Sequence, residues 1–346
     1  MKRALVISGG GSKGAFAVGV VKRLLREYPN LDFDMYVGTS TGSLIAPLAA
    51  MGAYDLLEEL YTNIKTSDII TKGNLGDRLS QHSIFDATPL WQLIEKYFNE
   101  ENYQILQASG KHLYLTTTCL QTSELVVFTN NPAPTASQHY EVRTLVNGDH
   151  FRKAVMASAC QPVFMPPIKV NLKVPGEAHP NYQFVDGGVR EYAGIQMAID
   201  NDAIEVFTIL LSTGQKVLLD TEFKTIFPIL QQTIVIFTED VAKNDLIVPG
   251  QYNEALAYID AVKKKMKKAG IEEAKINEYF KAGKDGNPFE NKLPLKLYNF
   301  RPDKPLGGGP GGLSFDSDEM KRMIAAGQKV SNDFITSLSP GDITWA

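Results

Sequence analysis

The first fifty residues of the chain contain the same structural unit twice: a short apolar run, a glycine-rich turn and a segment with helical spacing. Residues 4–8 predict a strand, Gly9-Gly10-Gly11 predicts a tight turn, and residues 15–28 predict a helix. Residues 35–37 and 44–51 repeat the strand and the helix around a second glycine turn. Two such units in succession imply right-handed crossovers, and therefore an α/β fold with a mainly parallel sheet between helices.

The rest of the chain continues this alternation to about residue 215 and then changes character. Further strands are predicted over residues 113–118, 125–129, 182–185 and 205–211, and further helices over residues 88–98, 151–157 and 191–199. Later elements are two helices over residues 221–241 and 253–268, a late strand within residues 293–300 and a final helix to about residue 335. We therefore expect a core over residues 1–215 and a mainly helical C-terminal portion, residues 216–346, packed on the same domain.

Composition and charge exclude several classes of function. The 346 residues carry 35 basic and 39 acidic side chains, a net charge of −4, so the chain lacks the basic surplus of nucleic-acid-binding proteins. Its only cysteines, Cys119 and Cys160, exclude a disulfide framework and a four-cysteine zinc site. No run approaches the roughly 18 apolar residues that cross a bilayer, and the N-terminal apolar run is too short for a signal peptide. We therefore expect a soluble cytoplasmic protein.

A serine lies at the centre of the second glycine turn. Residues 38–42, Gly38-Thr39-Ser40-Thr41-Gly42, form a G-x-S-x-G sequence between a predicted strand and a predicted helix. This context is typical of a nucleophile elbow, in which the glycines let the chain turn sharply and expose the serine above the sheet. The alternative is a plain turn whose Ser or Thr caps the helix. The flanking elements favour Ser40 as a nucleophile.

The first glycine loop has more than one interpretation. Gly9-x-Gly11-x-x-Gly14 matches a dinucleotide-binding fingerprint, which would make the chain a nicotinamide-dependent oxidoreductase. That site needs an acid at the carboxyl end of the second strand, whereas Asp32 and Asp34 precede this strand and Ser40 follows it. The loop amides therefore suit an oxyanion better than a pyrophosphate, and a turn without any ligand is the remaining alternative. A P-loop is excluded because Lys13 is followed by glycine.

A serine nucleophile needs a base, and an aspartate is a stronger candidate here than any histidine. Asp186 follows an apolar strand and precedes two glycines, so it is expected at the same carboxyl edge of a parallel sheet as Ser40. The alternative for Asp186 is a turn or helix-cap residue. None of the five histidines is flanked like a catalytic turn: His82, His112, His139, His150 and His179.

Three blocks together resemble, in order and spacing, the patatin-like phospholipase family: residues 9–14 (GGGSKG), 38–42 (GTSTG) and 186–188 (DGG). Residues 83–90 and 157–166 are also similar to family sequence, and the resemblance covers roughly residues 4–215. It implies a three-layer α/β/α sandwich that hydrolyses acyl esters of lipids with a Ser-Asp dyad, without histidine, cofactor or, usually, metal.

The resemblance also implies roles for particular residues. Ser40 corresponds to the nucleophile, Asp186 to the base, and Gly9, Gly10 and Gly11 to the oxyanion loop. Residues 189–193 depart from the asparagine-rich stretch of many members, which leaves the substrate-side wall undetermined.

Several alternatives remain open at the level of sequence. The expected partner is a lipid or another acyl-ester substrate, but the same dyad would serve an acyltransferase, and the elbow could belong to a lipid-binding protein without turnover. Residues 263–268, rich in lysine, predict either peripheral contact with an anionic membrane or a solvated helix end. Residues 67–87 predict either a mobile cover or an ordinary surface connection. The oligomeric state is not predicted.

Overall fold

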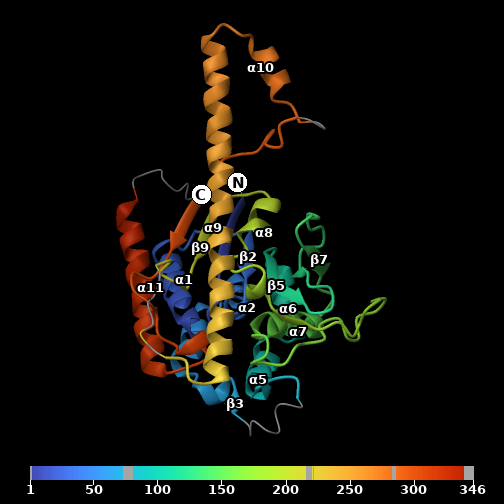
Figure 1. The fold of residues 1–346 in the computed structure, drawn as a ribbon, viewed down its shortest axis with the longest axis vertical. Coiled ribbons are helices and arrows are strands. Elements are labelled where there is room, and N and C mark those ends of the chain that lie inside the picture. Colours follow the sequence, from blue (N-terminus) through green and yellow to red (C-terminus); the bar gives the residue numbers. More distant parts are fainter. Residues whose placement is uncertain (1, 73–80, 216–219, 221, 283–285, 339–346) are drawn as a thin grey trace.

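The computed structural model describes residues 2–72, 81–215, 220, 222–282 and 286–338. The main sheet has the strand order β10-β9-β1-β2-β5-β6-β7, and β8 pairs with β5 (Figure 1). Its strands are β1 (Lys2–Ile7), β2 (Met35–Gly38), β5 (His112–Cys119), β6 (Leu125–Thr129), β7 (Glu141–Thr144), β8 (Phe184–Asp186), β9 (Ala203–Ile209) and β10 (Lys296–Phe300). A separate antiparallel pair consists of β3 (Thr71–Lys72) and β4 (Phe85–Asp86).

The central sheet is mainly parallel, as predicted. β1 pairs in parallel with β2 and β9, β2 with β5, β9 with β10, and β6 with β7. Only β6 and β8 run antiparallel to their neighbour β5. The carboxyl ends of β1 and β2 therefore lie side by side, which brings the two glycine turns to one edge of the sheet.

Helices cover both faces of the sheet and complete the predicted three layers. Side chains of β1 alternate between the two cores: Leu5 and Ile7 belong to one, Ala4 and Val6 to the other. The larger core includes helices α1 (Gly14–Glu27), α2 (Thr41–Ala50), α3 (Tyr54–Asn63), α5 (Thr88–Tyr97), α6 (Glu100–Ala108), α7 (Gly148–Ala159) and α11 (Ser317–Ser337). The smaller core includes α8 (Ile195–Asp200) and a contact from the long helix α9 (Ile226–Lys268); α10 (Glu273–Tyr279) packs near its far end (Figure 1).

The C-terminal portion is helical but also completes the core. Its strand β10 pairs with β9, and its last helix α11 packs closely against α1. Ser331 donates a hydrogen bond of 3.2 Å to the Val20 carbonyl, and a Cβ on Gly19 would lie 2.1 Å from the Ile324 carbonyl oxygen. These contacts join the two portions into one packed unit. They do not mark a boundary near residue 215, which stays a prediction.

Several predicted elements have different limits. The two helices expected over residues 221–241 and 253–268 are one continuous helix, α9, because Pro249 is buried and the neighbouring turns pack on the body. The helix expected over 191–199 begins only at Ile195, since Gly194 adopts a left-handed φ of 69° and stops the helix from starting earlier. Short, mostly polar elements were not predicted: α3, α6, α10 and β7. Of the possible cover, residues 67–87, positions 73–80 lie outside the described residues.

Candidate active site

Ser40 lies at a strained turn between β2 and α2. Its φ of 56° and ψ of −124° are unfavourable for a residue with a side chain, as is usual at a nucleophile elbow. A Cβ on Gly42 would lie 2.1 Å from the Ile7 carbonyl oxygen, so only glycine allows α2 to pack this close to β1. The Ser40 N–H donates a 3.1 Å hydrogen bond to the Ser158 hydroxyl on α7. The turn is therefore held by both its sequence and its neighbours.

Asp186 reaches the same place by a route that the sequence reasoning did not foresee. Its strand β8 is antiparallel to β5, so the expectation of a parallel strand ending at Asp186 is wrong. β6 occupies the other edge of β5, and β8 therefore extends the edge on which β2 ends. Gly38 pairs with Leu115 and Asp186 with Thr117, so the two strand ends point toward each other. Strand ends that converge in this way bring Ser40 and Asp186 together.

The Asp186 carboxylate is buried beside Ser40. It accepts a 2.7 Å hydrogen bond from the Gly188 N–H. Burial raises the pKa of Asp186 to about 6, and the nearby Ser40 side chain and the Gly188 N–H oppose this rise. Asp186 is thus a stronger base than an ordinary aspartate and still largely ionised at neutral pH.

The three glycines of the first loop line the cavity beside Ser40, but they are not equivalent. A Cβ on Gly9 would lie 3.0 Å from the Ser40 Cβ, so this glycine leaves room for the nucleophile. Its N–H donates to the Tyr192 carbonyl at 3.4 Å and is already engaged. No partner among the described residues accepts a hydrogen bond from the N–H of Gly10 or Gly11. These two amides are the donors best placed to bind an oxyanion.

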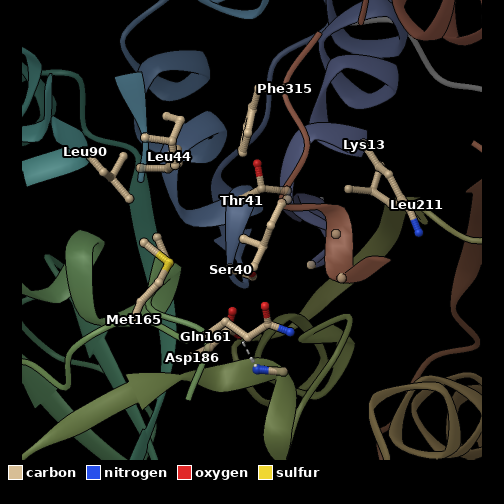
Figure 2. Close-up of a pocket in the computed structure, with 18 of the residues that line it drawn as sticks. Lys13, Ser40, Thr41, Leu44, Leu90, Gln161, Met165, Asp186, Leu211 and Phe315 are labelled. Atoms are coloured by element: carbon tan, nitrogen blue, oxygen red, sulfur yellow. Dashed lines mark hydrogen bonds between the residues drawn. The ribbon is translucent and has the colours of Figure 1, made fainter. Parts of the chain in front are cut away.

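Ser40 and Asp186 line a largely apolar cavity of about 210 Å³. Figure 2 shows Leu44, Leu90 and Met165 to one side of Ser40, and Lys13 and Leu211 to the other. Further apolar walls come from α3, α5, α9 and the segment after β10, through Leu60, Ile94, Tyr97, Ile234, Leu313 and Phe315 among others. The walls beside Ser40 are therefore mostly apolar.

Comparison with known proteins places the chain in a family. The sequence profile of the patatin-like phospholipases matches residues 5–199, more than half of the chain. The chain belongs to the patatin-like phospholipase family. A cUMP-AMP-activated phospholipase of Escherichia coli is 42% identical over 64 residues, which cover 17% of this chain and 20% of that protein. The match thus spans about a fifth of that relative's length.

Among solved structures, VipD from Legionella pneumophila aligns with a TM-score of 0.42 and 12% sequence identity. The alignment covers 97% of this chain and 67% of that one.

Two site residues of this patatin-like protein were not given a role by the sequence reasoning. Ser158 binds the Ser40 backbone, and Gln161 lines the cavity beside Asp186, with a buried Oε1 atom that has no partner among the described residues (Figure 2). Both belong to the stretch 157–166, whose resemblance to family sequence was the available signal. Lys13 and Glu239 also line the cavity; burial lowers the pKa of Lys13, and Glu239 opposes this.

The long helix α9 takes part in the site through Asp245. Its carboxylate accepts hydrogen bonds from the N–H of Tyr192 at 2.6 Å and of Ala193 at 3.0 Å. Tyr192 in turn accepts from Gly9, so α9 holds the loop that connects Asp186 to the glycine loop. Burial and the nearby Asp245 raise the pKa of Glu191, and burial raises the pKa of Asp245 as well. Residues 189–193, undetermined from sequence, form a cavity wall through Val189 and Tyr192.

The five histidines lie away from the cavity. All five histidines fall within the described residues, and none lines it; His150 is buried against Phe128 and hydrogen bonded to Asn171 at 3.2 Å. Within the described ranges, no group of three or more His, Cys, Asp or Glu side chains could hold a metal ion. In the same ranges, no helix is long and apolar enough to span a membrane.

The lysine run lies at the end of α9 that extends beyond the body of the molecule (Figure 1). Lys264 pairs with Asp260 at 2.6 Å and Lys267 with Glu273 at 3.0 Å, while Lys263 lies over the Phe280 ring. Three of its lysines are therefore already engaged within the chain. Membrane contact through this run stays a prediction.

Proposed function

We propose that the chain hydrolyses acyl esters of lipids through an acyl intermediate on Ser40, with Asp186 as the base. The observation that carries this proposal is the strained turn of Ser40 beside the buried Asp186 carboxylate, inside an apolar cavity. A structural turn needs neither the strain nor the buried charge, both of which cost stability.

In the acylation step, the Ser40 oxygen attacks the ester carbonyl carbon while its proton passes to the Asp186 carboxylate. The carbonyl oxygen becomes an anion, and the amides of Gly10 and Gly11 stabilise it. When the carbon–oxygen bond to the alcohol breaks, Asp186 returns the proton to the departing alcohol. The products are the free alcohol and an acyl group on Ser40.

Water then completes the reaction. Asp186 takes a proton from a water molecule, whose oxygen attacks the acyl carbon, and the second tetrahedral anion uses the same amides. Collapse of this anion breaks the bond to Ser40, which recovers the proton from Asp186, and releases the fatty acid. The raised pKa of Asp186, to about 6, makes the carboxylate a better proton acceptor for both steps.

The cavity walls support a long acyl group as the substrate. Leu44, Leu90 and Ile94 lie in the part of the cavity formed by α2 and α5 and offer apolar contacts. The acyl chain would lie there, and the alcohol portion would leave on the side of Gln161 and the glycine loop. Gln161 offers the leaving alcohol a hydrogen bond partner.

Covalent labelling tests this function directly. A fluorophosphonate probe is expected to label Ser40, with the site located by peptide mapping, and p-nitrophenyl esters and lysophospholipids are expected to be hydrolysed. EDTA is expected to leave hydrolysis of a soluble ester unchanged. Label at a different serine would refute the assignment of the nucleophile, and transfer of the acyl group to an added alcohol in place of water would identify an acyltransferase.

A further inference from the structure

The outer face of α9 carries a row of exposed apolar side chains with polar residues between them. Each of them is between 48% and 73% exposed, which is unusual for large apolar residues in a packed helix: Ile226, Ile229, Ile236, Phe237, Ile247, Val248 and Tyr258. At 3.6 residues per turn, they fall within an arc of about 120° and extend over about 48 Å of helix. We call these seven residues the outer row.

The opposite side of the same helix is already used. Ile234, Val235 and Thr238 line the cavity, and Leu256 is buried. α10 packs against the part of α9 that extends beyond the body (Figure 1). The outer row therefore has no packing role within the described part of the chain.

Three pairs within the outer row are symmetric about residue 242: Ile226 with Tyr258, Ile236 with Val248, and Phe237 with Ile247. The mirror position of Ile229 is Ala255. Among the polar residues on this face, Thr233 mirrors Gln251 and Asp240 mirrors Asn244, whereas Glu254 mirrors Leu230.

We infer that the outer row is the interface between two copies of this chain, whose α9 helices pack antiparallel about a two-fold axis near residue 242. In such a pair, each residue faces its mirror position on the second copy, as an interface with two-fold symmetry requires. Apolar residues then face apolar residues at the three symmetric pairs of the outer row. The Asp240 carboxylate faces the Asn244 amide of the second copy, which can donate a hydrogen bond to it.

The charges of this segment argue against an anionic lipid surface as the partner. Residues 226–258 contain four acidic side chains and one basic one, a net charge of −3. Helices that lie on membranes usually carry lysine and arginine beside their apolar face, and anionic lipids repel acidic ones. Asp240, 67% exposed, lies in the middle of the row, where lipid would surround it.

Crosslinking between two single-cysteine variants tests the antiparallel arrangement. The native cysteines are buried, so Thr233→Cys and Gln251→Cys each add one accessible thiol. In the inferred dimer, position 233 faces position 251, whereas the two copies of either position lie about 27 Å apart. A short dithiol crosslinker should therefore join a mixture of the two variants and leave each variant alone uncrosslinked. Crosslinking of each variant alone would show a parallel pair and refute the inference.

Sedimentation velocity on the full-length protein gives an independent test. The wild type should sediment at twice 38.2 kDa, and Phe237→Glu should weaken the dimer at least about thirtyfold. Ile105→Glu, at an exposed isoleucine on α6, is the matched control and should stay dimeric. Because Asn244 is exposed, two further variants keep the fold: Asn244→Asp should weaken the dimer and Asn244→Lys should tighten it.

A wild type that stays monomeric at tens of micromolar would overturn the inference. Binding of such a monomer to phosphatidylglycerol vesicles, lost in Phe237→Glu, would identify the outer row as a lipid-binding surface. The inference is independent of the proposed hydrolysis, since Ser40→Ala should dimerise like the wild type.

Discussion

The two halves of the candidate site are built in different ways. The turn at Ser40 closes on itself, with hydrogen bonds of 2.8 Å from Gly42 to Thr39 and from Ser43 to Ser40. The Asp186 half depends on distant segments: Cys160 accepts its N–H, and Asp245 of α9 holds the loop that follows. The nucleophile therefore belongs to a local motif, whereas the position of the base depends on contacts that extend into the C-terminal portion.

Among substitutions outside Ser40 and Asp186 themselves, one that breaks the local half should have the largest effect. In Gly42→Ala, the new Cβ would lie 2.1 Å from the Ile7 carbonyl, so α2 must shift and Ser40 with it. We expect thermal unfolding to show a loss of about 1–3 kcal/mol, and ester turnover to fall at least about a thousandfold. Gly250→Ala, where no atom lies within 4 Å of the added Cβ, is the control and should keep both properties.

The distant half should respond more mildly. Asp245→Ala removes the acceptor for the Tyr192 and Ala193 amides, so the loop loosens while Ser40 and Asp186 keep their strands. We expect kcat to fall by about ten- to a hundredfold with a smaller change in KM, and the acidic limb of the pH profile to move. Asp260→Ala, at an exposed aspartate of the same helix, should behave as the wild type. An unchanged pH profile in Asp245→Ala would assign this residue a purely structural role.

The pH profile should report the state of Asp186. The carboxylate must be ionised to accept the Ser40 proton, and burial raises its pKa to about 6. kcat/KM for a soluble ester should therefore rise with pH, by about tenfold per unit below this value, and level off above it. A profile that levels off only above neutral pH would point to a histidine or another base.

The same burial should make Asp186 costly for stability. Its pKa is higher in the folded chain than the ordinary 3.8, so the folded state is penalised once the unfolded chain loses this proton. The penalty is absent below the ordinary pKa, grows as pH rises toward about 6, and reaches at most about 3 kcal/mol above that. Asp186→Asn should therefore unfold at a higher temperature than the wild type at about pH 8, with the difference lost near pH 4.

The smallest effects are expected at the histidines, because none lines the cavity. Each alanine variant, tested singly, should change turnover of a soluble ester by less than about tenfold, or roughly 1.4 kcal/mol of barrier. The buried His150 is the most informative, since its loss also removes a contact with Asn171 and should lower the melting temperature. The variants are at positions 82, 112, 139, 150 and 179.

The elements that were predicted correctly can be recognised from a few adjacent residues. The strands at 4–8, 35–37 and 125–129 are apolar and bounded by turn residues. The Gly38–Gly42 motif includes the two glycines that its sharp turn requires. Asp186 was found through the glycines that follow it, although its strand runs antiparallel. The direction of β8 is set by how this strand pairs with β5, and no local pattern of residues encodes that pairing.

What could not be predicted depends on contacts between distant residues. Asp245 looks like an ordinary polar position of a surface helix until α9 is placed against the loop at Tyr192. Proline usually interrupts a helix, yet α9 continues through Pro249, which is buried. Ser158 and Gln161 likewise acquire roles only when α7 meets the elbow.

The central claim is that Ser40 and Asp186 act as one unit, and a double-mutant cycle tests it most directly. Turnover of a soluble p-nitrophenyl ester would be measured for Ser40→Ala, Asp186→Asn and the combined variant, with circular dichroism to show that each is folded. We expect each single change to lower kcat by about ten-thousandfold, and the combined variant to have nearly the same kcat as either single variant. Losses that multiply in the combined variant, or an active Asp186→Asn, would contradict it.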